Sequence, residues 1–403
     1  LLGTIFSAGV SFDTLEENST TYNSGMTSSS WTNVTIDSNG SVGRHTSLAV
    51  DSQDNIHISY YDADNKDLKY ARFDGNQWNH TTVAGSAVDS NVGMDDYGMY
   101  SSIALNSSDR VHIAYYDESS GALNLAVKYG NPNSITTQWH HTVVDGSDSL
   151  NNVGTSLSLA IDSGDKIHFA YQNSSDASLK YTSCRSVYEC YGLMSPPTWY
   201  QAQAPTKVAE FDGDGLDIAI GINDQIHIVY DDNNSLNQAS YDQTNNSWSI
   251  SESPTKSRPQ TISVEIDSDD YLHIAYHRHV SEQERIVYTK YSESSGWGSI
   301  FTVENYLNGC GIPSYPSIVL DSDEFPIISY ACDIVPGLQL WVAEFDETMS
   351  PQRYLIDEYP YPDTNGVGQY SHIGIDSVNG IHISYHDLSN ANLKYAHLVG
   401  TGS

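Results

Sequence analysis

The sequence has little positive charge and no long apolar run. Its 403 residues include 17 Lys and Arg against 51 Asp and Glu, a formal net charge of -34. Such an acidic chain repels phosphate backbones and anionic lipid headgroups, so nucleic acid is not an expected partner. The apolar stretch at residues 1–12, LLGTIFSAGVSF, is shorter than the roughly 20 residues of a membrane-spanning helix. We therefore expect no membrane span, and we expect this stretch to pack against something.

Cysteine is also scarce, and its spacing favours disulfides over metal binding. The four cysteines form two close pairs, Cys184 with Cys190 and Cys310 with Cys332, which could each close a local loop in an oxidising compartment. Neither pair has the CxxC-like spacing of a zinc site. Glycosylation sequons occur at Asn18, Asn33, Asn39, Asn79, Asn106, Asn173, Asn233 and Asn245. Together these features predict an extracellular or cell-surface glycoprotein with two disulfides.

One phrase recurs along the chain. It reads SLAVDSQDNIHISYYDADNKDLKYA from Ser47, SIALNSSDRVHIAYYDESSGALNLA from Ser102 and SLAIDSGDKIHFAYQNSSDASLKYT from Ser158, and four weaker copies follow. Each copy contains three runs of β-forming residues separated by turn signals. The position of His57 recurs at intervals of 46 to 59 residues, which suits a four-stranded blade. Seven copies predict an all-β, seven-bladed β-propeller of four-stranded antiparallel blades.

The fourth strand of each blade predicts how the ring closes. A fourth run follows each of the first six copies, headed by Trp78, Trp139, Trp199, Trp248, Trp297 and Arg353. The seventh copy has no such run, whereas Trp31 opens one at residues 31–36, before the first copy. We therefore expect residues 31–36 to pair near residues 393–398 and complete blade seven, which leaves no open edge. The propeller would span residues 31–403, preceded by an apolar segment and linker at residues 1–30.

The blade phrase DS-x-x-x-IHISYYD-x-x-x-x-x-LKYA resembles the repeat of secreted microbial β-propellers in the sialidase-like or BNR-type group, over about residues 31–398. The resemblance implies the fold and leaves the activity open, since propellers serve as lectins, adhesins, lyases and glycosidases. The sialidase Asp box, S-x-D-x-G-x-x-W, is absent, and no motif assigns Arg44, Arg258 and Arg278 to a sialidase arginine triad. Sialidase activity is therefore not expected.

A second, local resemblance concerns calcium. The stretch EFDGDGLDIAIG is similar to the calcium loops of FG-GAP propellers, although it is one residue shorter. Glu210, Asp212, Asp214 and Asp217 would supply the oxygen ligands that Ca²⁺ prefers. A Gly-rich acidic turn without a metal is the alternative, and Ca²⁺ is the only cofactor that the sequence suggests.

Most of the repeated residues are interpreted as structural. The His of the second run and the Asp or Asn of the preceding turn recur around the ring, which predicts a hydrogen bond that staples each blade. The repeated tyrosine pairs, such as Tyr60 with Tyr61, are expected to pack between blades.

Ligand-binding candidates are the departures from the repeat near the start of the first strand or the end of the second. These two points lie at the same face of each blade. The candidates are Arg44, His45, Tyr100, Arg258, His277, Arg278, His279, Tyr315, Tyr370 and His386. Blades one and five stand nearly opposite in the ring, so Arg44 and the residues 277–279 are expected to form a basic spot that suits an anionic sugar.

Three functions remain open from the sequence. The preferred interpretation is a non-enzymatic extracellular propeller that recognises glycans or surface proteins, as in adhesion. The second is a polysaccharide lyase or glycoside hydrolase that acts on an anionic polysaccharide, with His277, His279, Tyr370 and Arg278 offering acid, base and charge-neutralising groups. The third is a structural subunit of an extracellular filament or surface layer that self-assembles through residues 1–12.

Overall fold

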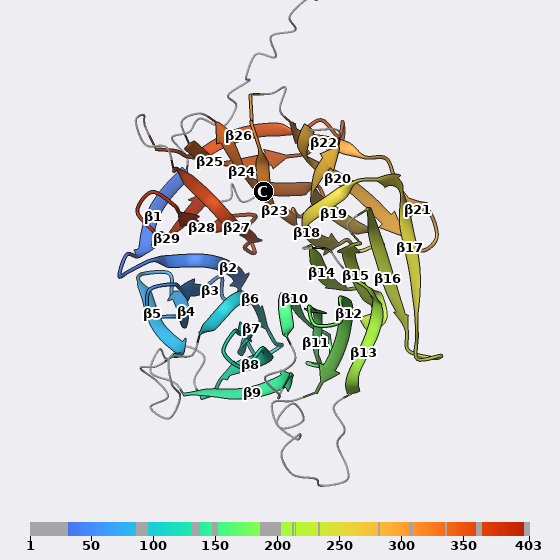
Figure 1. Cartoon of the computed structure of the whole chain (residues 1–403). Coiled ribbons are helices and arrows are strands. Elements are labelled where there is room, and N and C mark those ends of the chain that lie inside the picture. The colour runs from blue at the N-terminus through green and yellow to red at the C-terminus, as the bar shows by residue number, and fades with distance from the viewer. Residues whose placement is uncertain are drawn as a thin grey trace, which may run out of the picture.

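A computed structural model describes residues 31–85, 96–130, 138–146, 152–185, 203–211, 213, 215–232, 234–280, 283–305, 309–334, 337–359 and 365–398. In this part of the chain the structure is a ring of seven antiparallel sheets, which confirms the predicted seven-bladed β-propeller. Figure 1 shows the blades arranged around a central axis. Among the described residues there is no α-helix, and hence no helix long and apolar enough to cross a membrane.

Each blade is numbered in chain order, and its strands run from the central channel outward. The first and innermost strands are β2 (Val42–Val50), β6 (Tyr97–Leu105), β10 (Val153–Ile161), β14 (Leu216–Ile220), β18 (Arg258–Ile266), β23 (Pro313–Leu320) and β27 (Val367–Ile375). The second strands are β3 (Ile56–Asp62), β7 (Val111–Asp117), β11 (Ile167–Asn173), β15 (Ile226–Asp231), β19 (Leu272–Val280), β24 (Pro326–Ile334) and β28 (Ile381–Asp387). A short 3-10 turn, η3 (Ile222–Asp224), joins β14 to β15.

The third strands carry the LKYA-like run of the repeat. They are β4 (Asp67–Phe73), β8 (Ala122–Lys128), β12 (Ser178–Cys184), β16 (Ser235–Asp242), β20 (Gln283–Ser292), β25 (Gly337–Glu344) and β29 (Asn392–Leu398). The outer strands are β5 (Trp78–Ala84), β9 (Trp139–Asp145), β13 (Gln203–Glu210), β17 (Ser247–Lys256), β22 (Phe301–Asn305), β26 (Gln352–Asp357) and β1 (Trp31–Asp37). In blade five the two-residue β21 (Gly296–Trp297) precedes β22, and both pair with β20.

The ring closes as predicted. Strand β1 pairs antiparallel with β29, from Trp31 opposite Leu398 to Asp37 opposite Leu393. It thereby supplies the fourth strand of the sheet that holds β27 and β28. In Figure 1 the first described strand, in blue, lies beside the last, in red.

The core lies between the blades. Seven clusters of buried apolar side chains occur in the described residues, and each joins two neighbouring blades. Buried tyrosines bond across the same interfaces: the Tyr60 hydroxyl donates to Asp37 Oδ2 at 2.8 Å, and Lys69 forms an ion pair with the same carboxylate. These contacts bear out the expected inter-blade packing of the repeated tyrosines.

The predicted stapling bond is present in four blades. In blade one, His57 Nε2 lies 3.1 Å from Asp51 Oδ2 and His57 Nδ1 lies 2.7 Å from the Tyr70 hydroxyl. The same Asp–His–Tyr arrangement occurs around His168, His273 and His382. Each imidazole thus joins the turn, the second strand and the third strand of its blade.

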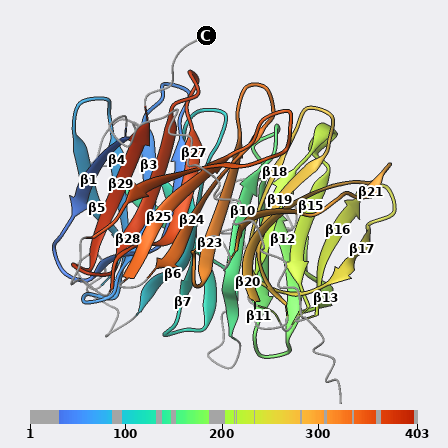
Figure 2. The ribbon, with the colours of Figure 1, turned by 90° about the horizontal axis from the view of Figure 1, so that it is seen from above.

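The turns between the first and second strands form a hydrogen-bonded ring on one face, here called the turn face. In each blade a turn N–H donates to a side chain in the turn of the next blade, at 2.8 to 3.2 Å. The accepting residues all have a positive φ between 56° and 66°, and they are Asp54, Asp109, Asp165, Asp224, Asp270, Glu324 and Asn379. Figure 2 shows the blades from the side, with loops at both faces.

The disulfide between Cys310 and Cys332 is formed and joins the approach to β23 with β24, as predicted. Cys184 is also disulfide-bonded, and its expected partner, Cys190, lies outside the described residues.

Candidate functional site

The innermost strands of six blades share a β-bulge at the face opposite the turn face, and β14 of blade four pairs without one. The pairing with the second strand shifts there, for example between Arg44 and Ser47 and between Gln369 and His372. In five blades the bulge holds a non-glycine residue with a positive φ of 46° to 53°, and these residues are His45, Tyr100, Ser156, Tyr315 and Tyr370. This backbone region costs about 1–3 kcal/mol for such residues. Strain of this kind at equivalent points of one channel is typical of a functional surface.

A glycine two residues earlier makes the bulge possible in four of these blades. In blade two, Gly98 has a φ of 105°, and a Cβ there would lie 2.7 Å from Leu68 Cα in the neighbouring blade. Only glycine lets the two backbones come this close, and Tyr100, two residues further along the strand, points toward the channel.

Four of the bulge residues form a continuous aromatic arc, which consists of Tyr315, Tyr370, His45 and Tyr100. Ring centroids are 4.9 Å apart between Tyr315 and Tyr370, 4.6 Å between Tyr370 and His45, and 4.7 Å between His45 and Tyr100. The four residues come from four consecutive blades: six, seven, one and two. All four were predicted from the sequence as site residues, and the structure places them side by side.

The arc forms one wall of a cavity of about 450 Å³ at the channel mouth. The opposite wall has no aromatic ring. Beside Leu157, Leu216 and Ile262 it offers hydroxyls and amides from four polar residues, Ser156, Gln172, Gln260 and Thr261. These four residues were missed in the sequence, although Ser156 occupies the same bulge position as Tyr100. Alignment of the repeats at the glycine before the bulge would have identified it.

The cavity differs in charge from the protein as a whole. Among the described residues that line it there is no carboxylate, although one residue in eight of the chain is acidic. Arg44, next to His45, is exposed and forms no ion pair with any residue that the structure describes. Arg44 itself does not line the cavity, but its positive charge lowers the pKa of His45 and of His386, which places the guanidinium near the arc.

His386 is buried behind the arc. Its side chain is 1% exposed, and neither ring nitrogen has a hydrogen-bond partner among the described atoms. Its ring centroid lies 6.4 Å from that of Tyr370. Burial and the positive charge of Arg44 lower the pKa of His386 to about 4, and burial, Arg44 and His386 do the same for His45. Both imidazoles are therefore neutral at physiological pH.

The blade-five candidates form a separate group. The carboxylate of Glu284 lies between two imidazoles, 2.8 Å from His277 Nε2 and 2.5 Å from His279 Nδ1. Arg278 is half-buried on the same strand, and Arg258 is the strand partner of His279. None of Arg44, His277, Arg278 and His279 lines the cavity, so the basic spot that the sequence predicts from them stays a prediction.

The calcium prediction rests partly on Asp212 and Asp214, which lie outside the described residues. Glu210 pairs with Lys207 at 2.6 Å. Asp217 is turned into the interface between blades, where it accepts from the Ser158 hydroxyl at 2.6 Å and from Val264 N at 2.8 Å. Burial raises its pKa to about 6. Calcium binding by this loop stays a prediction.

Most of the predicted sequons that can be placed are accessible. Asn33, Asn39 and Asn245 are exposed, and Asn79 and Asn106 are partly exposed. Asn173 is only 4% exposed, so a glycan there would conflict with the folded blade. Asn18 and Asn233 lie outside the described residues.

No protein-family model matches the sequence, and no curated protein matches it. Solved structures do match. An ulvan lyase of a new polysaccharide lyase family has a TM-score of 0.58 at 12% identity, with 91% of this chain and 94% of that chain covered. An α-L-arabinanase of Penicillium chrysogenum, solved with arabinobiose, has a TM-score of 0.51 at 12% identity, with coverage of 92% and 98%. A protein of unknown function from Dyadobacter fermentans has a TM-score of 0.52 at 11% identity, with coverage of 91% and 98%.

At such identities the similarity shows the propeller fold alone. The sialidase-like group named from the repeat remains a resemblance.

Proposed function

We propose that this protein is an extracellular propeller that recognises a carbohydrate, and that the sugar binds across the aromatic arc. The observation that carries the proposal is the arc itself, with four rings from consecutive blades and with hydroxyls and amides across the same cavity. Aromatic faces pack against the C–H faces of sugar rings, while amides and hydroxyls bond the sugar hydroxyls. The size of the cavity, about 450 Å³, suits one or two sugar units.

The charge of the mouth favours an acidic polysaccharide. Arg44 is exposed beside the arc, and the described lining carries no carboxylate to repel an anion. An arginine binds a uronic carboxylate or a sulfate through paired N–H donors. The ulvan lyase and the arabinanase that share the fold are named for polysaccharides, which supports a glycan without identifying it.

A lyase is the second candidate, favoured by His386. A buried imidazole without a hydrogen-bond partner is unusual and needs an explanation. In an elimination on a uronic unit, a base removes the proton beside the carboxylate, the C–O bond to the neighbouring sugar breaks, and the leaving oxygen is protonated. Tyr370 at the cavity, His386 behind it and the exposed Arg44 nearby are groups of these types. A glycoside hydrolase is less well supported, because it typically uses two carboxylates.

The deciding experiment is a glycan-array screen that includes uronic and sulfated polysaccharides, followed by affinity measurements on Tyr100→Asn and Tyr370→Asn. Asparagine tolerates a positive φ, so these variants remove the rings with little change to the bulge. We expect each to weaken binding about tenfold, roughly the loss of one aromatic contact. Tyr129→Ala removes an exposed tyrosine that does not line the cavity and is the matched control. Unchanged affinity in both arc variants would refute the proposed site.

The same samples separate recognition from catalysis. A lyase releases products with unsaturated uronic ends, and these can be measured by their absorbance. Product release by the wild type that is lost in Tyr370→Phe, while binding persists, would establish a lyase. Binding without product supports the recognition protein. Assembly through residues 1–12, which lie outside the described residues, would be favoured if neither is observed.

A further inference from the structure

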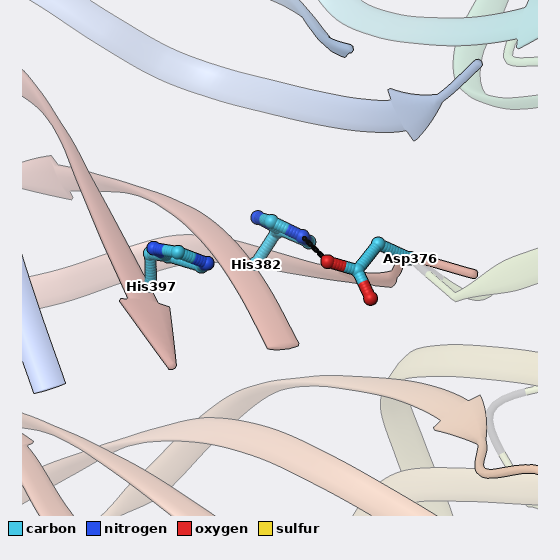
Figure 3. Close-up of side chains that lie close together, drawn as sticks. All are labelled: Asp376, His382 and His397. Carbon is cyan, nitrogen blue, oxygen red and sulfur yellow. Dashed lines mark hydrogen bonds and ion pairs between the residues drawn. The ribbon is translucent and has the colours of Figure 1, made fainter. Parts of the chain in front are cut away.

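Blade seven differs from the other stapled blades by one imidazole. His397 on β29 is the strand partner of His382 on β28, and their rings stack with centroids 4.8 Å apart. With Asp376, in the turn after β27, they form a group whose potential ligand atoms all lie within 4.8 Å of one another. Figure 3 shows the two imidazoles and the carboxylate in a row.

The position of His397 carries a cation in two of the other three stapled blades, and in blade three it is Ser183. The strand partner of His57 is Arg72 in blade one, and that of His273 is Lys290 in blade five. Lys290 Nζ lies 3.6 Å from Asp267 Oδ2, the carboxylate equivalent to Asp376. Blade seven thus has a nitrogen ligand beside the stapling carboxylate where blade five has a fixed positive charge.

We propose that Asp376, His382 and His397 bind a divalent transition-metal ion of the Zn²⁺ type. Two imidazole nitrogens and one carboxylate oxygen form a common zinc donor set, and they leave a fourth position for water or a ligand. Nitrogen donors favour Zn²⁺ and its neighbours over Ca²⁺ or Mg²⁺. The site is unrelated to the calcium loop and to the aromatic arc.

Two of the three ligands are already oriented. His382 Nε2 and Asp376 Oδ2 are 3.1 Å apart, close to the roughly 3.3 Å between neighbouring ligands of a tetrahedral ion with bonds of about 2.0–2.1 Å. His382 Nδ1 lies 2.5 Å from the Tyr395 hydroxyl, and Asp376 Oδ1 accepts from Val378 N and Gly380 N. Such outer contacts fix ligand orientation at metal sites.

His397 is the ligand that must move. Its ring lies parallel to that of His382, with an interplanar angle of 9°, so it has to tilt toward Asp376 to share an ion. His397 and Asp376 are both partly exposed, which gives the ring room to turn and the ion a path from solvent.

The test is calorimetric titration of the chelator-treated full chain with Zn²⁺. We expect His397→Lys, which restores the Lys of blade five, to lose one Zn²⁺ site and to retain the wild-type melting temperature in the absence of metal. Lys290→His places a third ligand beside Asp267 and His273, and it should gain one site.

The number of Zn²⁺ ions bound is compared between the wild type, His397→Lys and Lys290→His. Other histidine clusters contribute equally to all three proteins, so a difference in this number reports on the proposed site. Added Zn²⁺ should also raise the melting temperature of the wild type more than that of His397→Lys. Equal Zn²⁺ stoichiometry in the wild type and His397→Lys, or no binding at micromolar Zn²⁺, would overturn the proposal. A Lys290→His chain that gains no site would count against it as well.

Discussion

Ser377 donates its backbone N–H and its hydroxyl to the carboxylate of Asp54, at 2.9 Å and 2.7 Å, across 323 residues of sequence. This contact joins blade seven to blade one at the turn face. It complements the pairing of β1 with β29, which closes the ring at its outer edge. The first and last blades are therefore held by both an inner and an outer contact.

The contact between Ser377 and Asp54 should contribute measurably to stability. Asp54→Ala removes the acceptor of two hydrogen bonds at an exposed site, and we expect a loss of about 1 kcal/mol in the free energy of unfolding. Urea unfolding of Asp54→Ala, Ser377→Ala and the double variant measures the coupling. Asp109→Ala, which breaks the equivalent contact between blades one and two, is the control. Strictly additive effects of the two substitutions would disprove the coupling.

Removal of the Asp37 carboxylate should be far more damaging. Burial alone would raise its pKa, but bonds from Lys69, Asn39 and Tyr60 outweigh burial and hold the pKa below 3.8. Asp37→Ala leaves the Lys69 ammonium buried without this partner, so we expect a loss of about 3–5 kcal/mol. Because the folded-state pKa is depressed, this stability is present above pH 3.8 and is lost below it. A loss below 1 kcal/mol in denaturant unfolding near neutral pH would contradict this prediction.

His386 should make the protein sensitive to mild acid. The pKa of His386 is about 4 in the folded protein, whereas its ordinary value is 6.5. Between pH 4 and pH 6.5 the imidazole is therefore protonated in the unfolded chain and neutral in the folded protein. Stability is therefore lost as pH falls from 6.5 to 4, by about 3 kcal/mol from this residue. His386→Tyr, which introduces the residue found at Tyr61 and Tyr116, should remove that part of the pH dependence. Parallel stability profiles of the two proteins across this range would show the prediction to be wrong.

Glu265 has the opposite dependence. Burial, together with repulsion from Asp217, raises its pKa to about 8 from 4.5. The folded protein then holds a proton that the unfolded chain has lost, so stability falls as pH rises from 4.5 to 8. Glu265→Gln should remove this slope and stabilise the protein by on the order of 3 kcal/mol at about pH 8, with little effect at about pH 4.5. Urea unfolding at both values measures the difference, and an equal effect at the two would argue against a raised pKa.

The repeat in the sequence was sufficient for the architecture. Its period and turn signals predict seven blades, and the unpaired run after Trp31 predicts the pairing with residues 393–398, because strand patterns and turn chemistry are local properties. The recurrence of Asp51 and His57 also predicts the staple, since six residues separate them in one hairpin.

The composition of the candidate site was decided by tertiary structure. Tyr315, Tyr370, His45 and Tyr100 are far apart in sequence, and they meet because a positive-φ bulge recurs at the same height in four neighbouring blades. His277 and His279 were candidates from the sequence as well, but they lie on the second strand of blade five, contact Glu284 and do not line the cavity. The sequence alone thus determined the number of blades and their closure, through local periodicity. Which departures from the repeat share a cavity depended on distances across the ring, and only the folded ring sets these.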